Sequence, residues 1–86
     1  MILIIFAVRD VATASYDKPM FMVSEGQMIR AFSDEVNRAD KDNVLYRHPN
    51  DYEVFRVGLY DTDTGIIEPV AVPVAVVSGK SVAIRE

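Results

Sequence analysis

Apolar and polar positions between residues 24 and 39 repeat with the period of an amphipathic helix. When each residue turns by about 100°, the apolar side chains fall within one arc of roughly 100°; they are Met28, Ile29, Phe32, Val36 and Ala39. Ser24 and Gln27 have the spacing of a capping box, in which each side chain satisfies an unpaired backbone donor. The pattern predicts a helix over residues 24–39 that lies on a sheet, with Phe32 at the centre of the contact.

Three further apolar segments predict strands of that sheet. Residues 2–8 are apolar at every position, which is typical of a central strand that is buried on both faces. Residues 20–23 form a shorter apolar run that leads directly into the helix. The run that starts at residue 66 is interrupted by Pro69 and Pro73, which cannot donate to a strand ladder, so we expect an edge strand or an irregular one.

Residues 53–60 alternate between two faces and predict a half-buried strand. The two predicted faces are Phe55, Val57 and Leu59 on one side, and Val54, Arg56, Gly58 and Tyr60 on the other. Residues 61–65 then favour a hairpin turn in which Gly65 adopts a positive φ. Residues 44–46 fit a strand or an anchored loop, and residues 81–86 fit a strand or a frayed end. Together the elements predict an α+β fold, with one amphipathic helix packed on a mostly antiparallel sheet of four or five strands.

The apolar surface of these strands exceeds what one helix can cover. The strand at residues 2–8 has two apolar faces, so a partner subunit or another sheet layer is needed over the face that the helix leaves open. The return strand adds an apolar stripe, made of Val70, Val72, Val74 and Val76. We therefore predict a homodimer or a higher homo-oligomer.

Length and charge limit the class of protein. With 86 residues, the chain is expected to form a single domain, 1–86, with one modest core. Its formal net charge of −4 argues against a protein that coats nucleic acid by bulk charge alone. The apolar run at residues 1–10 lacks the flanks of a signal peptide and is too short to cross a bilayer, so no membrane partner is expected.

No motif in the sequence indicates catalysis or metal binding. Cysteine is absent and His48 is the single histidine, which disfavours a zinc site and a histidine-activated nucleophile. The acidic loop at residues 61–65 has its glycine one position earlier than a calcium-binding EF-hand loop requires. The Gly79-Lys80-Ser81 triplet lacks the upstream glycine of a P-loop, because Val74 stands at that position. We predict a protein that is not an enzyme and has no catalytic residues, metal or cofactor.

Aromatic and basic residues interleave between residues 46 and 60, a combination typical of proteins that bind single-stranded nucleic acid. The residues predicted to contact DNA are Arg30, Arg47 and Arg56 at phosphates, with Tyr46 and Tyr52 as stacking platforms. The competing interpretation places Phe55 in the core and the arginines in solvent, because acidic residues lie among them and the overall charge is negative. This second interpretation is the one that the composition of the stretch favours.

Several segments, taken in order, resemble one phage protein family. They are residues 6–10, Tyr16, residues 19–21, residues 26–37, residues 48–52, and then Phe55, Gly58 and Tyr60-Asp61. Over roughly residues 4–65, this pattern resembles the small nonstructural protein of gokushoviruses, which are single-stranded DNA phages of the Microviridae. The helix followed by the His-Pro-x-Asp-Tyr sequence is the most specific part. Residues 66–86 fall outside the resemblance.

The resemblance implies a nonstructural protein that is made in the cytoplasm of the infected bacterium and is not a virion component. It also implies a role in viral DNA synthesis, or in the switch to single-stranded genome production and packaging. Two hypotheses follow for its partners. Either the protein binds single-stranded DNA, or it contacts phage replication or assembly proteins without binding DNA. The resemblance brings no catalytic residues with it.

Overall fold

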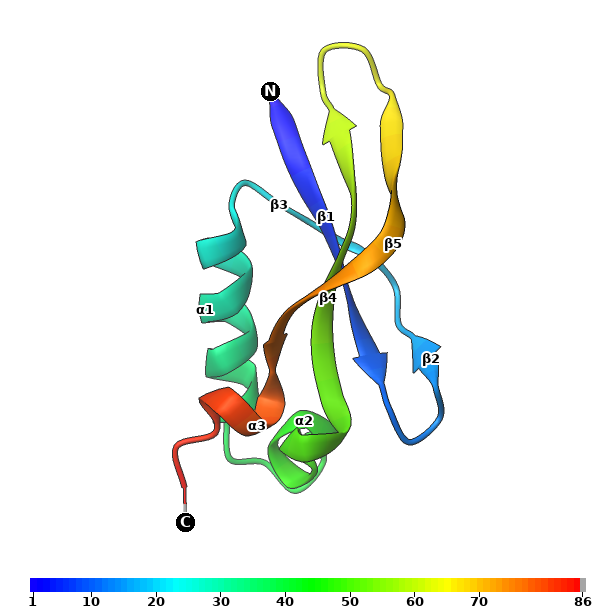
Figure 1. Cartoon of the computed structure of the whole chain (residues 1–86). Coiled ribbons are helices and arrows are strands. Elements are labelled where there is room, and N and C mark those ends of the chain that lie inside the picture. The colour runs from blue at the N-terminus through cyan, green and yellow to red at the C-terminus, as the bar shows by residue number, and fades with distance from the viewer. Residues whose placement is uncertain (86) are drawn as a thin grey trace.

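One amphipathic helix lies on a curled antiparallel sheet in the computed structural model, which describes residues 1–85 (Figure 1). In chain order the elements are β1 (Ile2–Asp10), β2 (Ser15–Tyr16), β3 (Met20–Met22), α1 (Glu25–Val36), α2 (Val44–Arg47), the 3-10 helix η1 (Pro49–Asp51), β4 (Tyr52–Asp61), β5 (Ile67–Ser78) and α3 (Gly79–Val82). The strand order is β2-β1-β4-β5, and β3 pairs with β1 on the edge that β2 also uses. Every pair is antiparallel, which confirms the predicted α+β fold.

Helix α1 begins where the sequence predicts it. Ser24 is the N-cap, and its hydroxyl accepts a hydrogen bond from the backbone N–H of Gln27 at 3.1 Å. The side-chain oxygen of Gln27 accepts a hydrogen bond from the backbone N–H of Val23 at 2.9 Å, one residue before the position that a capping box uses. Side chains thus satisfy two backbone donors around the start of the helix.

The helix ends at Val36, three residues before the predicted end. Asn37 is the C-cap, and its side-chain amide donates to the carbonyl oxygens of Ser33 and Val82, each at 2.9 Å. The side-chain oxygen of Asn37 accepts a hydrogen bond from the backbone N–H of Ile84 at 3.0 Å. The side chain of Asn37 thus bonds to the end of its own helix and to the C-terminal segment. Hydrogen bonds of this kind compete with the backbone hydrogen bonds of a further helical turn. The predicted helix is therefore too long at this end.

The apolar side of α1 packs on β1 and β4 and forms the core. The buried cluster comprises Phe6, Met28, Phe32, Val36 and Val54. Phe32 is 2% exposed, which confirms its predicted place in the contact between helix and sheet. The same cluster explains why one face of β1 is apolar.

The opposite face of β1 is also buried, although no second layer of helices or strands covers it within residues 1–85. Ile5 and Ala7 are each 4% exposed, and they alternate with Phe6, which belongs to the helix-side core. The prediction of a central strand buried on both faces is therefore confirmed. Aromatic side chains of the neighbouring strands lie over this face, so its burial does not require a second subunit or sheet layer. The homo-oligomer stays a prediction.

A β-bulge in β4 changes which residues share a face. Two consecutive residues of β1 pair with Gly58 and Arg56, so Val57 is an extra residue on β4. An extra residue shifts the alternation by one position, and the side chains beyond it change face. The predicted faces are therefore wrong. The helix-side face holds Val54, Arg56 and Leu59, and the other face holds Phe55, Gly58 and Tyr60.

β5 is an irregular edge strand, as its two prolines predict. Pro69 and Val74 pair with β4 residues that are only two positions apart, so residues 70–73 have Val57 alone opposite them. Val72 in this segment is 71% exposed. The predicted valine stripe is therefore interrupted, and this part of β5 leaves apolar side chains in solvent.

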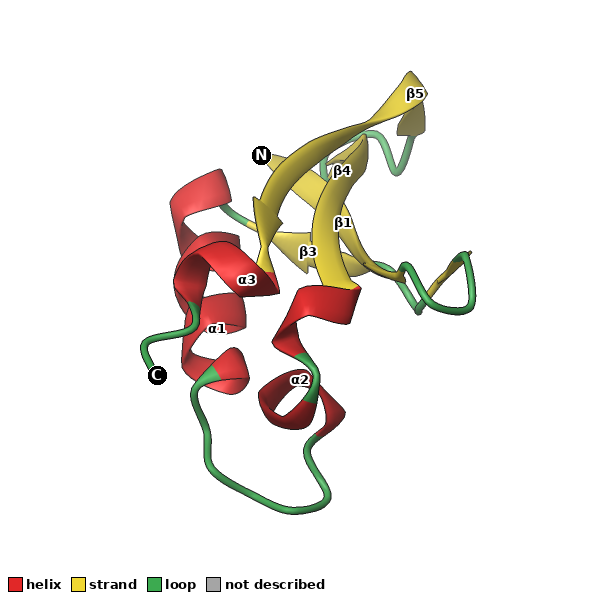
Figure 2. Ribbon diagram, turned by 60° about the horizontal axis from the view of Figure 1, so that its bottom comes forward, coloured by secondary structure: helices red, strands yellow, loops and turns green. Residues whose placement is uncertain are grey.

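Short helices form in two segments where the sequence predicts no helix. Residues 44–47 are α2, which follows the buried N-cap Asn43. Residues 79–82 are α3, which Ser78 caps by accepting a hydrogen bond from the backbone N–H of Ser81 at 3.2 Å. Both helices contact α1, and Figure 2 shows the three helices gathered on one side of the sheet. Between residues 1 and 85, no helix is long and apolar enough to cross a membrane.

Candidate nucleic-acid interface

Two pairs of aromatic rings lie on the sheet face that points away from α1. The rings of Tyr16 and Phe55 meet edge to face with their centroids 5.6 Å apart. The rings of Phe21 and Tyr60 meet in the same way at 5.5 Å. The guanidinium group of Arg9 lies 5.8 Å from the centre of the Tyr16 ring. We call the surface formed by these five residues the aromatic face; the helices lie on the other side of the sheet (Figure 2).

The strand register explains why these rings lie together. Tyr16 pairs with Arg9, and Phe55 pairs with Ala7. Because Ala7 and Arg9 are two positions apart on β1, their side chains and those of their pairing partners share one face. The first ring pair therefore reaches over β1 from the strands on either side and covers Ala7. The second pair does the same over Ile5.

Two of the four rings are open to solvent. Tyr16 and Phe21 are each 45% exposed, whereas Phe55 and Tyr60 are half-buried. Exposed aromatic surface that gathers on one face marks an interaction site more often than scattered single side chains do. Ring faces of this kind can stack with other flat groups, and nucleobases are among the partners that they bind in this way.

The arginines predicted from the sequence lie on three different elements. Arg30 is exposed on α1, and Arg47 is exposed on α2. Arg56 lies on the helix-side face of β4, where its Nε is buried and has no hydrogen-bond partner within residues 1–85. All three therefore lie away from the aromatic face.

The predicted stacking tyrosines are both engaged in contacts within the protein. The ring of Tyr46 lies 4.1 Å from the guanidinium group of Arg85, which also donates to the carbonyl oxygen of Tyr46. Tyr52 packs against the helix-side core, and burial raises its pKa, with the Asp10 carboxylate adding to the effect. The structure keeps Tyr46 beside Arg47 on α2 and places the other predicted residues on α1 and β4. Their role in DNA binding stays a prediction.

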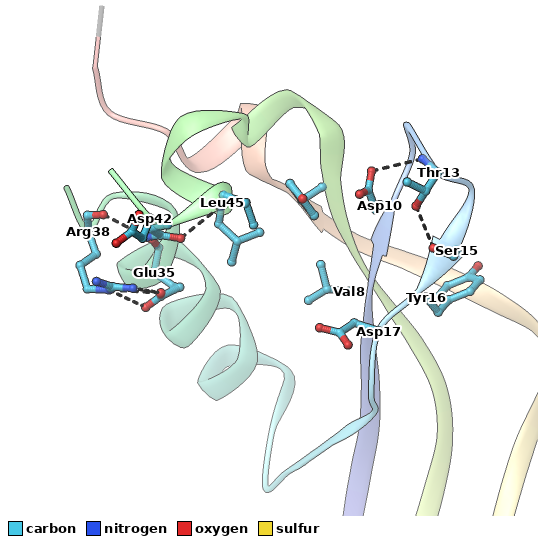
Figure 3. Close-up of a pocket in the computed structure, with 13 residues that line it drawn as sticks. Val8, Asp10, Thr13, Ser15, Tyr16, Asp17, Glu35, Arg38, Asp42 and Leu45 are labelled. Carbon is cyan, nitrogen blue, oxygen red and sulfur yellow. Dashed lines mark hydrogen bonds and ion pairs between the residues drawn. The ribbon is translucent and has the colours of Figure 1, made fainter. Parts of the chain in front are cut away.

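A cavity of about 540 Å³ lies between the C-terminal part of α1, α2 and the hairpin of β1 and β2 (Figure 3). Its lining includes the carboxylates of Asp10, Asp17, Glu35 and Asp42. Arg38 binds Glu35 at 2.6 Å, and this hydrogen bond lowers the pKa of Glu35, so the carboxylate stays charged at neutral pH. A negatively charged lining repels phosphate. In the described part of the chain, no three metal-ligating side chains form a cluster. The aromatic face is therefore the better candidate interface.

Four residues of the aromatic face were not among the sequence candidates, namely Arg9, Tyr16, Phe21 and Tyr60. The competing interpretation places Phe55 in the core, whereas the structure leaves it half-buried on the aromatic face. A partial signal existed, because each of these residues lies in a segment that carries the family resemblance. Which of them share a surface depends on strand register and on the bulge in β4, and a single sequence does not contain that information.

Comparisons with known proteins support the family resemblance. Residues 3–82 match the family described as Phage ORF5 protein. Over 42 residues the chain is 40% identical to Protein ORF5 of Chlamydia phage 1. This aligned stretch covers 49% of this chain and 44% of that relative. The aligned part thus spans less than half of the relative's length. No solved structure matches the chain.

The family match extends over nearly the whole chain and includes every residue of the aromatic face. It confirms the similarity to small gokushovirus proteins that the residues indicated. The chain therefore belongs to the Phage ORF5 protein family.

Proposed function

We propose that this protein binds single-stranded DNA through the aromatic face. The main support is the pair of edge-to-face ring contacts across β1, which leaves Tyr16 and Phe21 open on a surface without helices. Every nucleobase has a flat face, so exposed rings bind successive bases with little dependence on sequence. Unpaired bases are required, because the bases of a duplex are already stacked on each other.

The charge of the protein determines how much phosphate contacts can add to its affinity for DNA. The chain has a formal net charge of −4, and on the aromatic face the positive charge of Arg9 lies opposite the negative charge of Glu53, its pairing partner on β4. We therefore expect affinity to depend more on stacking than on phosphate contacts, and each phosphate contact to add only about 0.7 to the salt slope. In the cytoplasm of the infected bacterium, a nonstructural protein of this kind acts in viral DNA synthesis, or in the switch to single-stranded genome production and packaging.

Replacing Tyr16 or Phe21 by alanine is the test of this proposal. Each loss of a stacking ring is expected to cost about 1–3 kcal/mol of binding, which corresponds to a roughly 5- to 150-fold weaker Kd. The measurement is the fluorescence anisotropy of a labelled oligothymidylate, titrated at two salt concentrations. Stacking is uncharged, so the loss should be nearly the same at both.

Tyr46→Ala is the matched control, because it removes one tyrosine ring from α2 and leaves the aromatic face intact. Its affinity for the oligonucleotide should equal that of the wild type. If Tyr46→Ala and Tyr52→Ala weaken binding while Tyr16→Ala does not, the residues predicted from the sequence form the interface instead. Circular dichroism spectra verify that each variant is folded.

A second function is favoured by the exposed apolar side chains of β5. Ile67, Val72 and Val74 remain in solvent on this edge strand, and an apolar edge strand is a ready surface for another protein chain. On this alternative, the protein contacts phage replication or assembly proteins without binding DNA. Failure of the wild-type protein to bind any single-stranded DNA at about 50 mM salt, where phosphate contacts are strongest, would leave this alternative standing.

The same edge is where we expect a second copy of the chain to bind. Light scattering at micromolar concentration should give twice the monomer mass of 9.6 kDa, or more. Val72→Asp places a charge in the exposed segment of β5 and should return the protein to a monomer. A wild-type mass of 9.6 kDa under these conditions would show that β5 is not a self-association surface.

A further inference from the structure

A positive and a negative side chain lie next to each other at one end of the aromatic face. Arg9 on β1 pairs with Tyr16 on one side and with Glu53 of β4 on the other. Directly opposite residues of an antiparallel pair share a face and have their Cβ atoms about 4.5–5.5 Å apart. Glu53 also shares its face with Phe55, two positions further along β4. The two charged groups therefore border the ring pair of Tyr16 and Phe55.

Both groups have hydrogen-bonding capacity that the protein does not use. Within residues 1–85, neither Arg9 nor Glu53 takes part in an ion pair with another side chain. Each is half-buried, so the two groups are held near the sheet surface. A guanidinium group offers several N–H donors in one plane, and a carboxylate offers two acceptor oxygens. The rim of the ring pair thus presents donors and acceptors side by side.

We infer that Arg9 and Glu53 select guanine among the bases that stack against Tyr16; the inference rests on the proposed binding of single-stranded DNA. Guanine is the base that presents two adjacent N–H donors, N1–H and the N2 amino group, which fit the two oxygens of one carboxylate. Its O6 and N7 are neighbouring acceptors on the same rim, and arginine binds them in a bidentate manner. Glu53 accepts from the first pair of groups and Arg9 donates to the second.

The other bases satisfy this pair of side chains less well. Adenine and cytosine offer one amino group to a carboxylate, and thymine offers one ring N–H. A half-buried charge that stays unpaired when the wrong base is bound costs binding free energy. In a duplex, the N1–H and N2 amino groups of guanine are already paired with cytosine, so this selection operates on unpaired bases.

The test compares four labelled oligothymidylates of equal length, each with one central position occupied by thymine, guanine, adenine or cytosine. The wild-type protein should bind the guanine probe at least about fivefold more tightly than the others, since one bidentate contact discriminates by that much or more. A further probe carries hypoxanthine, which lacks the N2 amino group and should lose part of this preference. Glu53→Gln should lose the part of the preference that depends on the N1–H and N2 groups, so it should no longer distinguish the guanine probe from the hypoxanthine probe.

Glu68→Gln is the matched control, because it removes the same charge from an exposed position on β5. It should keep the guanine preference, whereas a general effect of charge would raise the affinity of both variants for every probe. Equal binding of all four probes by the wild type would overturn the guanine inference and leave the DNA-binding function intact. Absence of binding to every probe would overturn the proposed function itself, so the two failures are distinguishable.

Discussion

Replacing Phe32 by alanine is expected to unfold much of the protein. Phe32 is 2% exposed and belongs to the buried cluster between α1 and the sheet. Truncation of a buried phenylalanine costs about 3–5 kcal/mol, because it removes apolar contacts and leaves a cavity. The free energy of unfolding of a small domain is only about 5–15 kcal/mol. The substitution therefore removes much of this stability. Urea denaturation followed by circular dichroism measures the change in the free energy of unfolding.

Ile84→Ala is the control for this prediction, because Ile84 is 85% exposed. Its side chain has little apolar area to lose, and the hydrogen bond from its backbone N–H to Asn37 remains available. We expect its free energy of unfolding to stay close to that of the wild type. A Phe32→Ala protein as stable as the Ile84→Ala protein would show that α1 does not pack on the sheet through this residue.

Gly79→Ala is expected to have the second largest effect on stability. A Cβ atom at Gly79 would lie 2.1 Å from the carbonyl oxygen of Pro49. The three nearest atoms all belong to the backbone of Pro49, so α3 and η1 have to move apart, at a cost of about 3 kcal/mol. Thermal unfolding curves should show a clear fall in Tm for Gly79→Ala.

Gly26→Ala is the matched substitution, because the nearest atom to its added Cβ is 4.0 Å away. Alanine in a helix is up to about 1 kcal/mol more favourable than glycine, so this variant should unfold at a higher temperature than the wild type. A Gly79→Ala protein that melts like the wild type would contradict the close packing of α3 on η1.

Local features of the fold were predictable from the sequence. The Ser24 cap and the apolar side of α1 depend on residues a few positions apart, which a sequence pattern records. Gly65 has a φ of 74°, as its place in the hairpin turn predicts. The prolines at 69 and 73 likewise indicated an irregular strand, because proline has no N–H to donate to the strand ladder whatever its neighbours are.

Features that depend on contacts between distant segments were not predictable. The bulge at Val57 follows from the pairing of β4 with β1, and it moved Tyr60 to the face that Phe55 occupies. The aromatic face needs that bulge and also needs β2 and β3 on the far edge of β1. The end of α1 depends on Asn37, which binds a carbonyl group 45 residues further along the chain.

The central claim, that the aromatic face is the DNA-binding surface, is tested most directly by NMR. Backbone amide signals of isotope-labelled protein are recorded while unlabelled oligothymidylate is added. We predict that the largest shift changes cluster on β1, β2, β3 and β4 around the residues of the aromatic face, with little change along α1. Shift changes centred on Tyr46 and Arg47 of α2, or no change at all, would contradict the claim.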